Sequence, residues 1–302
     1  MNTFNFTAII SKGHLFKLMA MYQTLKVHCR DFRLFVLCVD QEAYTVLSKM
    51  NDEYMAPVNL MDIEDEELLT AKLNRNFREY CWTLKPFFLD YIMENKRSYY
   101  YAHLDADLCF YSNPTFIFEE NPQASVFLTH HRNSKMFESW YKKSGLFNTG
   151  FVGCQNDRIG QIAIKSWKED CLARCSNETY GDQRHVEKWP HILENVHVVN
   201  TVGANAAMWN IQSYTVSERN RMVILNEEPL IFYHFSGFTI ISEKEFNLCY
   251  FYFIKDKNTV NLIYRPYMML LHDVIKKTRN RFPWFNYGFT RKAPKKHRYI
   301  LY

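Results

Sequence analysis

Two aspartates stand one residue apart in the segment His103-Leu104-Asp105-Ala106-Asp107, at the end of the apolar run 99–104. Side chains alternate along a strand, so both carboxylates can point the same way as the strand gives way to a turn. Hard divalent cations prefer oxygen ligands, and a cation held by few protein oxygens keeps positions open for phosphate. The spacing therefore predicts a site for Mg²⁺ or Mn²⁺. The competing interpretation is a solvated or helix-capping pair of acids.

The elements around this segment alternate between strand and helix patterns. In the first half, strands are predicted at 6–10, 33–39, 57–61 and 99–104, and helices at 14–28, 41–50, from 62–67 onwards, and at 77–94 with a kink or new start at Pro86. The second half shows strand patterns at 124–129, 147–153, 196–199, 222–225 and 230–235, and helix patterns at 182–189 and, with Asp157 as N-cap, at 157–175. Strands separated by helices predict an α/β fold with a mostly parallel central sheet and helices on both faces. Ligands bind such sheets at the carboxyl ends of strands, where Asp105 and Asp107 lie.

Composition limits the class of protein. A chain of 302 residues with 47% hydrophobic residues can bury a large core, and it is long for one domain and short for two. Neither a signal peptide nor a membrane span of about 18 apolar residues is visible, which predicts a cytoplasmic protein. Eight scattered cysteines predict reduced, buried thiols rather than a zinc site. Cys171 and Cys175, four residues apart, are the pair that could still bind metal or be redox active.

Basic and aromatic residues gather at the C-terminus. From Lys276 onwards, nine lysines and arginines are interleaved with seven aromatic residues. Cations mixed with aromatic rings suit an anionic membrane surface, and a solvated or docked tail fits equally well. Aromatic rings can also stack on bases, but the rest of the chain has no matching basic surface. We therefore expect no nucleic-acid partner, and a peripheral contact at the inner face of the membrane and a solvated or docked tail stay as the two interpretations.

Five stretches, in this order, resemble the nucleotide-sugar glycosyltransferases of the GT-A fold. The resemblance is nearest to family 8, the retaining enzymes of the galactosyltransferase and glycogenin kind. The stretches are His103-Leu104-Asp105-Ala106-Asp107, Phe147-Asn148-Thr149-Gly150-Phe151-Val152, Gly181-Asp182-Gln183, Met208-Trp209-Asn210 and His234-Phe235-Ser236-Gly237. The resemblance covers residues 7–237. It implies a Rossmann-like catalytic domain over residues 1–240, followed by a helical and basic extension over residues 241–302.

The resemblance assigns a role to each stretch. Asp105, Asp107 and His234 would bind Mn²⁺ or Mg²⁺, although a histidine after an apolar strand can also be a core or rim residue. Asp182 would contact hydroxyls of the donor sugar and Gln183 its anomeric face, although Asp is also a good N-cap. The other implied residues are Asn148 in catalysis, Gly150, Trp209 and Asn210 in the acceptor or sugar pocket, and Ala106 and Gly237 at the donor.

The chain departs from the family at two places. The family has an arginine upstream of its aspartates, and the matching cation here is Lys85, which could bind diphosphate or be a surface residue. The family's Lys-Pro-Trp is missing, because Phe238-Thr239-Ile240 follows Gly237; Lys12, Lys85 or Lys244 could replace that lysine. By analogy with the fold, the base and ribose would lie against Ala8, Ile9, Ser11 and Asp40.

The sequence therefore predicts a metal-dependent glycosyltransferase that uses a nucleotide-sugar, with uridine diphosphate as the expected carrier and guanosine diphosphate as the alternative. The acceptor would be a carbohydrate or a lipid-linked glycan, such as a lipopolysaccharide or capsule precursor. Transfer would proceed with retention, by front-face attack or through a covalent intermediate. A nucleotidyltransferase that makes the nucleotide-sugar would need a Gly-rich loop bearing arginine, which Ser11-Lys12-Gly13-His14 does not supply. The alternative outside enzymes is a carbohydrate-binding or membrane-binding module.

Overall fold

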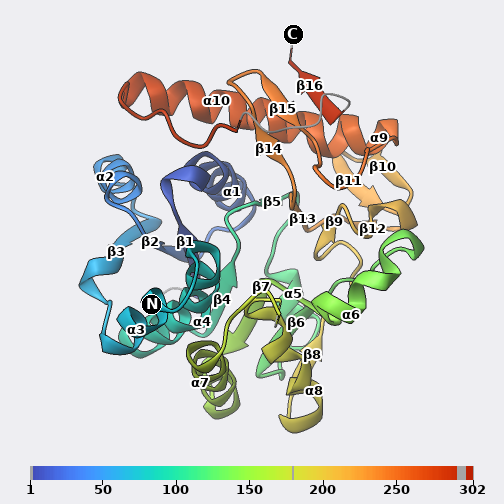
Figure 1. Ribbon diagram of the computed structural model, residues 1–302. Coiled ribbons are helices and arrows are strands. Elements are labelled where there is room, and N and C mark those ends of the chain that lie inside the picture. The colour runs from blue at the N-terminus through green and yellow to red at the C-terminus, as the bar shows by residue number, and fades with distance from the viewer. Residues whose placement is uncertain (1–2, 179, 291–296, 302) are drawn as a thin grey trace. The chain divides into compact units, whose positions relative to one another are not determined.

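The computed structural model describes residues 3–178, 180–290 and 297–301 (Figure 1). The chain divides into two compact units, each assembled from separate segments. Unit 1 comprises Met1–Ile10, Arg30–Asp105 and Thr115–Asn200, and unit 2 comprises Ser11–Cys29, Ala106–Pro114 and Thr201–Tyr302. The predicted domain boundary after residue 240 stays a prediction.

Unit 1 is built on a seven-stranded sheet with the strand order β3-β2-β1-β4-β7-β6-β8. Its strands are β1 (Phe4–Ile10), β2 (Phe32–Cys38), β3 (Met55–Asn59), β4 (Tyr100–Leu104), β6 (Val126–His130), β7 (Phe147–Gln155) and β8 (Val196–Val198). Neighbouring strands pair in parallel, except that β7 runs antiparallel to both β4 and β6. This mixed, mostly parallel sheet confirms the predicted α/β fold class.

Helices flank this sheet. They are α2 (Gln41–Met50), α3 (Glu66–Leu73), α4 (Phe77–Asn95), α5 (Phe116–Glu119), α6 (Tyr141–Ser144), α7 (Arg158–Ala173) and α8 (Trp189–Ile192), with the 3₁₀ helix η4 at Gln183–Lys188. Asp157 caps α7 as predicted, since its Oδ1 accepts a hydrogen bond of 2.7 Å from Gly160 N. Helix α4 begins with a capping box at Asn76 and continues through Pro86. The predicted new start at Pro86 is therefore wrong: the ring is buried in the interior of the helix, where tertiary packing overrides local propensity.

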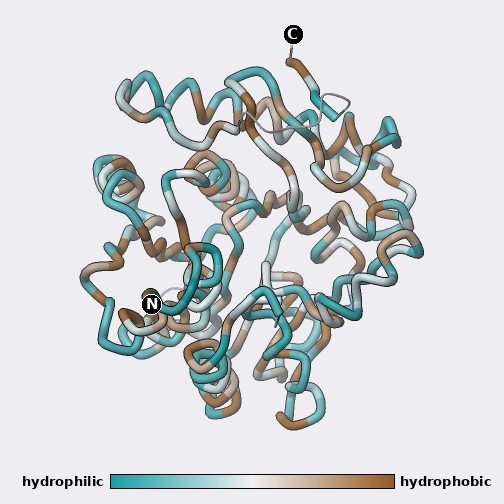
Figure 2. The backbone as a smooth tube through the Cα atoms, viewed as in Figure 1, coloured by the Kyte–Doolittle hydropathy of each residue, from teal (hydrophilic) through white to brown (hydrophobic). Residues whose placement is uncertain are grey.

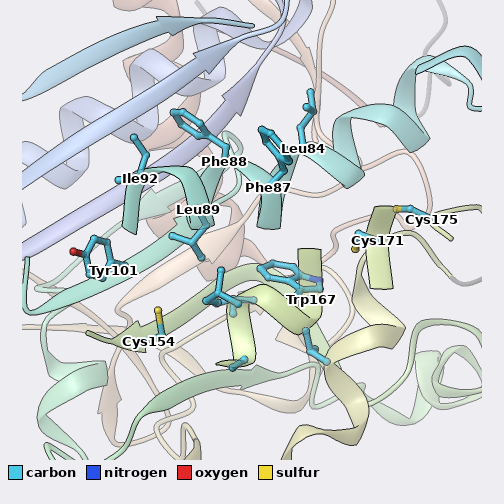
Figure 3. Close-up of a cluster of buried hydrophobic side chains, with 14 of the residues drawn as sticks. Leu84, Phe87, Phe88, Leu89, Ile92, Tyr101, Cys154, Trp167, Cys171 and Cys175 are labelled. Carbon is cyan, nitrogen blue, oxygen red and sulfur yellow. The ribbon is translucent and has the colours of Figure 1, made fainter. Parts of the chain in front are cut away.

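The main core of unit 1 lies between one face of the sheet and helices α4 and α7 (Figure 3). Tyr101 of β4 and Cys154 of β7 are register neighbours and belong to this core together with Trp167 of α7. Adjacent residues of a strand point to opposite faces. Tyr100 accordingly packs on the other face, where its ring centroid lies 4.7 Å from that of Phe118 in α5. By the same alternation, the side chain of His103 in β4 points to the face that α4 covers.

The described residues of unit 2 form three small sheets and two long helices. Its elements are α1 (Leu15–His28), β5 (Leu108–Phe110), β9 (Ala206–Ala207), β10 (Val216–Arg219), β11 (Met222–Leu225), β12 (Glu228–Pro229), β13 (Phe232–His234), β14 (Thr239–Ile240), β15 (Glu245–Asn247), α9 (Lys257–Thr259), α10 (Arg265–Arg281) and β16 (Arg298–Ile300). Figure 2 shows hydrophobic and hydrophilic residues alternating along α10, as in a helix with one buried face. The strand pattern at 230–235 becomes β13, which pairs with β5 and β9 in a sheet of its own rather than joining the large sheet.

The basic aromatic C-terminal segment is partly docked on unit 2. Phe282 and Phe285 are buried, and the ring of Phe285 packs edge-on against Phe16 of α1 at 5.5 Å. These two rings support the docked interpretation, whereas Trp284 and Tyr287 are exposed. The predicted basic and aromatic positions Arg291, Lys292, Lys295, Lys296 and Tyr302 lie outside the described residues.

Two further sequence expectations concern thiols and membrane spans. All eight cysteines are free thiols, and all but the half-buried Cys81 are buried, as predicted. In the parts of the chain that the structure describes, no helix combines the length and apolar character needed to cross a bilayer.

Candidate metal and donor site

In unit 1, Asp105 stands at the end of β4 beside two nitrogen-bearing side chains. Its Oδ1 lies 2.8 Å from Nζ of Lys85 and 3.2 Å from Nε2 of His103. His103 follows Tyr101 by two residues, so its side chain points to the same face of β4. Helix α4 covers this face, and Lys85 is a residue of α4. The backbone is fixed as well, because Asp105 N donates a hydrogen bond of 2.8 Å to the carbonyl of Gly150 in β7. Burial lowers the pKa of the His103 imidazole, against the hydrogen bond with Asp105.

Asp182 completes this group, which we call the Asp105 cluster (His103, Asp105, Lys85 and Asp182). Its side chain is buried, and its Oδ1 lies 3.6 Å from Lys85 Nζ. Burial raises the pKa of the Asp182 carboxyl, and the charge on Lys85 opposes that rise. Asp182 precedes η4 but makes no capping hydrogen bond, so the capping interpretation is wrong. Lys85 is only 8% exposed, so the surface-cation interpretation is wrong as well.

Gly181 explains how the chain brings Asp182 to this position. Its φ is +71°, a conformation that residues with a side chain rarely adopt. A Cβ on Gly181 would also come within 2.7 Å of the indole of Trp82 in α4. Only glycine lets the backbone pass this close to α4 just before the aspartate.

Asn148 and Gln183 hold each other beside this cluster. Gln183 Oε1 accepts a hydrogen bond of 3.0 Å from Asn148 Nδ2, and Gln183 Nε2 donates one of 2.7 Å to the carbonyl of Ser144. Asn148 Oδ1 in turn accepts from Gly150 N at 3.1 Å. These bonds tie η4 to β7, so the predicted residues Asn148, Gly150, Asp182 and Gln183 do come together.

In unit 2, Asp107 is surrounded by a second set of polar residues, the Asp107 cluster (Asp107, His234, Lys17 and Trp209). Its Oδ1 lies 3.1 Å from His234 Nε2, and its Oδ2 lies 3.7 Å from Lys17 Nζ. The antiparallel pairing of β5 and β13 sets this geometry, because it places His234 opposite Leu108, the residue after Asp107. The indole of Trp209 packs edge-on against the His234 ring at 5.3 Å.

The charges of this cluster keep Asp107 ionised. Burial by itself raises the pKa of the Asp107 carboxyl, but the charges of His234 and Lys17 and the hydrogen bond with His234 outweigh it. The net effect holds the pKa below its ordinary value. A carboxylate rather than a carboxylic acid is the form that binds a cation.

Asp105 and Asp107 are joined through Ala106 alone, and with His234 they form a candidate metal group. Each offers one ligand atom, and these atoms all lie within 4.8 Å of one another. Ligands at adjacent corners of an octahedron with bonds of about 2.1 Å are about 3.0 Å apart. The separation of 3.1 Å between Asp107 Oδ1 and His234 Nε2 matches that spacing. Two carboxylates and one imidazole therefore suit a divalent cation such as Mn²⁺ or Mg²⁺.

The residues predicted to bind the base lie at neighbouring strand ends. Ala8 and Ile9 are close to the carboxyl end of β1, and Asp40 follows β2, the parallel neighbour of β1. Asp40 also caps α2, since its Oδ1 accepts from Ala43 N at 2.9 Å. Ser11 begins unit 2, immediately before a short 3₁₀ helix. The capping role of Asp40 was not part of the sequence prediction.

Two predicted residues of unit 2 have clear local structural roles. Asn210 Oδ1 accepts from Ala207 N at 2.8 Å, and its Nδ2 donates to the carbonyl of Asn205 at 3.0 Å, which closes the turn that presents Trp209. Gly237 has a φ of +78°, and a Cβ there would come within 2.9 Å of the ring of Phe251. Backbone geometry by itself thus accounts for glycine at this position.

Lys17 and His103 are two site residues that the sequence does not predict. Lys17 is only 9% exposed and lies in α1 among the buried residues Phe16 and Leu18. A lysine in an otherwise apolar helix segment was the available signal, because lysine is rarely buried without a partner. His103 belongs to the segment that contains Asp105 and Asp107, but its spacing from them does not predict a role.

Comparison with known proteins places the chain among relatives from Bacillus subtilis (strain 168). It is 50% identical over 299 residues to the uncharacterized protein YfnD, covering 97% of this chain and 96% of the relative. It is 31% identical over 305 residues to the uncharacterized protein YfnF, covering 96% of this chain and 99% of the relative. No protein-family model matches the chain.

Two solved structures of the galactosyltransferase LgtC share the fold. The complex of LgtC with donor and acceptor sugar analogs matches with a TM-score of 0.58 and 11% identity, over 89% of this chain and 95% of that one. An active-site mutant of LgtC matches with a TM-score of 0.57 and 13% identity over the same shares. The chain belongs to the family of YfnD and YfnF, and its α/β fold is the GT-A-like fold of LgtC.

Proposed function

We propose that the protein is a metal-dependent glycosyltransferase that moves a sugar from a nucleotide-diphosphate donor, a UDP-hexose, to an acceptor with retention. The observation that carries the proposal is the group Asp105, Asp107 and His234, whose ligand atoms lie within 4.8 Å of one another, with Asp107 Oδ1 3.1 Å from His234 Nε2. A fold hosts many functions, so the proposal depends on this site and not on the fold alone.

The three metal ligands would hold the diphosphate end of the donor. Bound Mn²⁺ or Mg²⁺ supplies a positive charge that neutralises the negative charge growing on the leaving diphosphate. Lys85 pairs with Asp105 at 2.8 Å and would add a positive charge on the donor side. The backbones of Ala106 and Gly237 would also bind the diphosphate, and Ala8, Ile9, Ser11 and Asp40 would bind the base and ribose.

Asp182 and Gln183 would act on the sugar. Asp182 is a buried carboxylate held by Lys85, which suits it to accept hydrogen bonds from sugar hydroxyls. Both ends of the Gln183 amide are engaged, by Asn148 and by Ser144, so this side chain is held as a fixed dipole. That arrangement favours front-face attack assisted by the leaving diphosphate. The covalent alternative would require Asp182 as nucleophile.

The acceptor would be a glycan, and the C-terminal segment favours one linked to lipid. Gly150, Trp209 and Asn210 are the residues we assign to the sugar and acceptor pocket. Trp284 and Tyr287 are exposed aromatic residues next to the basic end of α10, which includes Arg279 and Arg281. This combination suits a peripheral contact with the cytoplasmic face of a membrane that carries the acceptor.

Incubation with Mn²⁺ and a panel of nucleotide-sugars tests the proposal, with slow release of nucleoside diphosphate as the readout. We expect hydrolysis of at least one donor, and a loss of about a hundredfold or more in Asp107→Asn. Asp170→Asn is the matched control, because it removes a half-buried carboxylate of α7 that pairs with Lys188 at 2.8 Å and belongs to neither cluster. A nucleotidyltransferase would instead release pyrophosphate from a nucleoside triphosphate and a sugar phosphate. A binding module would do neither, and either result would refute the proposal.

A further inference from the structure

His103 is a buried residue of the Asp105 cluster to which the proposed function gives no role. Its side chain is 1% exposed, and its two ring nitrogens face two different partners. Nε2 lies 3.2 Å from Asp105 Oδ1, and Nδ1 lies 3.4 Å from Oγ1 of Thr7. Thr7 is fully buried in β1 and is the register partner of His103 in β4. The main sheet therefore builds a continuous chain from hydroxyl to imidazole to carboxylate.

Hydrogen-bond chemistry gives this chain a direction. An ionised carboxylate only accepts, so the contact with Asp105 needs a proton on His103 Nε2. A neutral imidazole then has an acceptor at Nδ1, and the hydroxyl of Thr7 donates to it. Asp105 thereby sets the tautomer of His103, and the hydroxyl of Thr7 satisfies the nitrogen that this tautomer leaves as an acceptor, which holds the ring in place.

Two donors converge on one oxygen of Asp105 from different elements. Lys85 reaches Oδ1 from α4 on a flexible four-carbon stem, and His103 reaches it from β4 with a planar ring that has two rotatable bonds. The planar donor held by a strand neighbour is the more rigid of the two. It fixes the rotation of the carboxylate and hence the direction in which Asp105 presents itself to an ion.

We propose that Thr7 and His103 are positioning residues that orient Asp105 for divalent-cation binding. The inference rests on the proposed function, because it gives Asp105 the role of a metal ligand. Partners that orient metal ligands typically change metal affinity by about 10- to 100-fold when they are removed.

Four variants test the inference through the dissociation constant of Mn²⁺, measured from the free-ion electron paramagnetic resonance signal. His103→Leu removes both contacts, His103→Gln keeps an N–H that can reach Asp105, and Thr7→Val removes the hydroxyl while preserving the shape. His197→Leu is the matched control, since His197 Nε2 lies 2.8 Å from Glu120 Oε2 at the far strand β8 of the same sheet. The unfolding temperature of each variant is measured alongside.

We expect His197→Leu to bind Mn²⁺ like the wild type and His103→Leu to bind about 10- to 100-fold more weakly. His103→Gln should recover most of that loss, and Thr7→Val should weaken Mn²⁺ binding by less than His103→Leu does. A purely structural role would change unfolding temperatures without this pattern of affinities. Wild-type affinity in folded His103→Leu would overturn the inference and leave the proposed function standing.

Two other outcomes are also decisive. If His103→Leu does not fold, Thr7→Val decides, because valine has nearly the same shape as threonine. Weakened Mn²⁺ binding by Thr7→Val then supports the inference, and wild-type binding overturns it. If the wild type itself does not bind Mn²⁺, both the inference and the metal-dependent function are overturned.

Discussion

Replacing Lys85 with methionine removes the cation that two carboxylates of unit 1 share. Lys85 Nζ lies 2.8 Å from Asp105 Oδ1 and 3.6 Å from Asp182 Oδ1. At an effective dielectric constant of about 20, each contact corresponds to an attraction of about 5 kcal/mol, most of which offsets the cost of dehydrating the charges. Loss of one member of a buried pair typically costs about 3–5 kcal/mol. The Asp105 side chain keeps 24% of its surface exposed, so we expect a loss at the lower end of this range. Lys85→Met should lower the free energy of unfolding by about 3 kcal/mol.

The pH dependence of this loss has a definite sign. Burial raises the pKa of Asp182 and Lys85 lowers it, so Lys85→Met raises the pKa of Asp182 further. The folded variant then binds protons more tightly than the unfolded chain, in which an aspartate titrates near about 3.9. Stability therefore rises as the pH falls towards the raised pKa, and the deficit of Lys85→Met should shrink on acidification from neutral pH.

Urea unfolding with EDTA present measures this prediction. Lys85→Arg should keep most of the stability because it keeps the charge, and Asp182→Asn should recover part of the loss when combined with Lys85→Met. A Lys85→Met protein within about 0.5 kcal/mol of the wild type, the usual effect of an exposed substitution, would refute the reasoning. A deficit that does not change with pH would show that Asp182 is not the carboxylate at stake.

Two further predictions concern the residues that support the Asp105 cluster. Gly181→Ala should lose about 1–2 kcal/mol or more, because a left-handed φ of +71° is combined with a Cβ within 2.7 Å of an indole ring; an unchanged thermal unfolding midpoint would contradict this. Asn148→Ala should lose about 1–3 kcal/mol, because Gln183 Oε1 and Gly150 N each lose a buried partner. Chemical denaturation measures that loss, and a variant as stable as the wild type would show that the two amides do not support each other.

The sequence predicted the parts of the fold that have a local cause. The apolar run before Asp105 formed β4, and Asp157 capped α7, because periodicity and capping depend on neighbouring residues. The antiparallel direction of β7 and the pairing of β13 with β5 were beyond it. A strand of three residues such as β13 carries no pattern that identifies its partner, and strand direction depends on connections formed over long distances in the sequence.

The site shows the same division. The spacing of Asp105 and Asp107 suggested a metal, and the resemblance added His234 and Asp182. Two partners of the aspartates were missed: Lys17 comes from α1, and His103 acquires a role only when β1 lies beside β4. Their chemistry arises from pairs of residues that are distant in the sequence, and single-sequence spacing does not record such pairs.

Anomalous diffraction from crystals grown with MnCl₂ and UDP locates the ion itself. We expect one manganese peak within about 2.0–2.6 Å of a carboxylate oxygen of Asp105, a carboxylate oxygen of Asp107 and Nε2 of His234, with a diphosphate oxygen on an open position. A peak elsewhere, or an ion held by the aspartates with His234 outside its coordination sphere, would contradict this expectation.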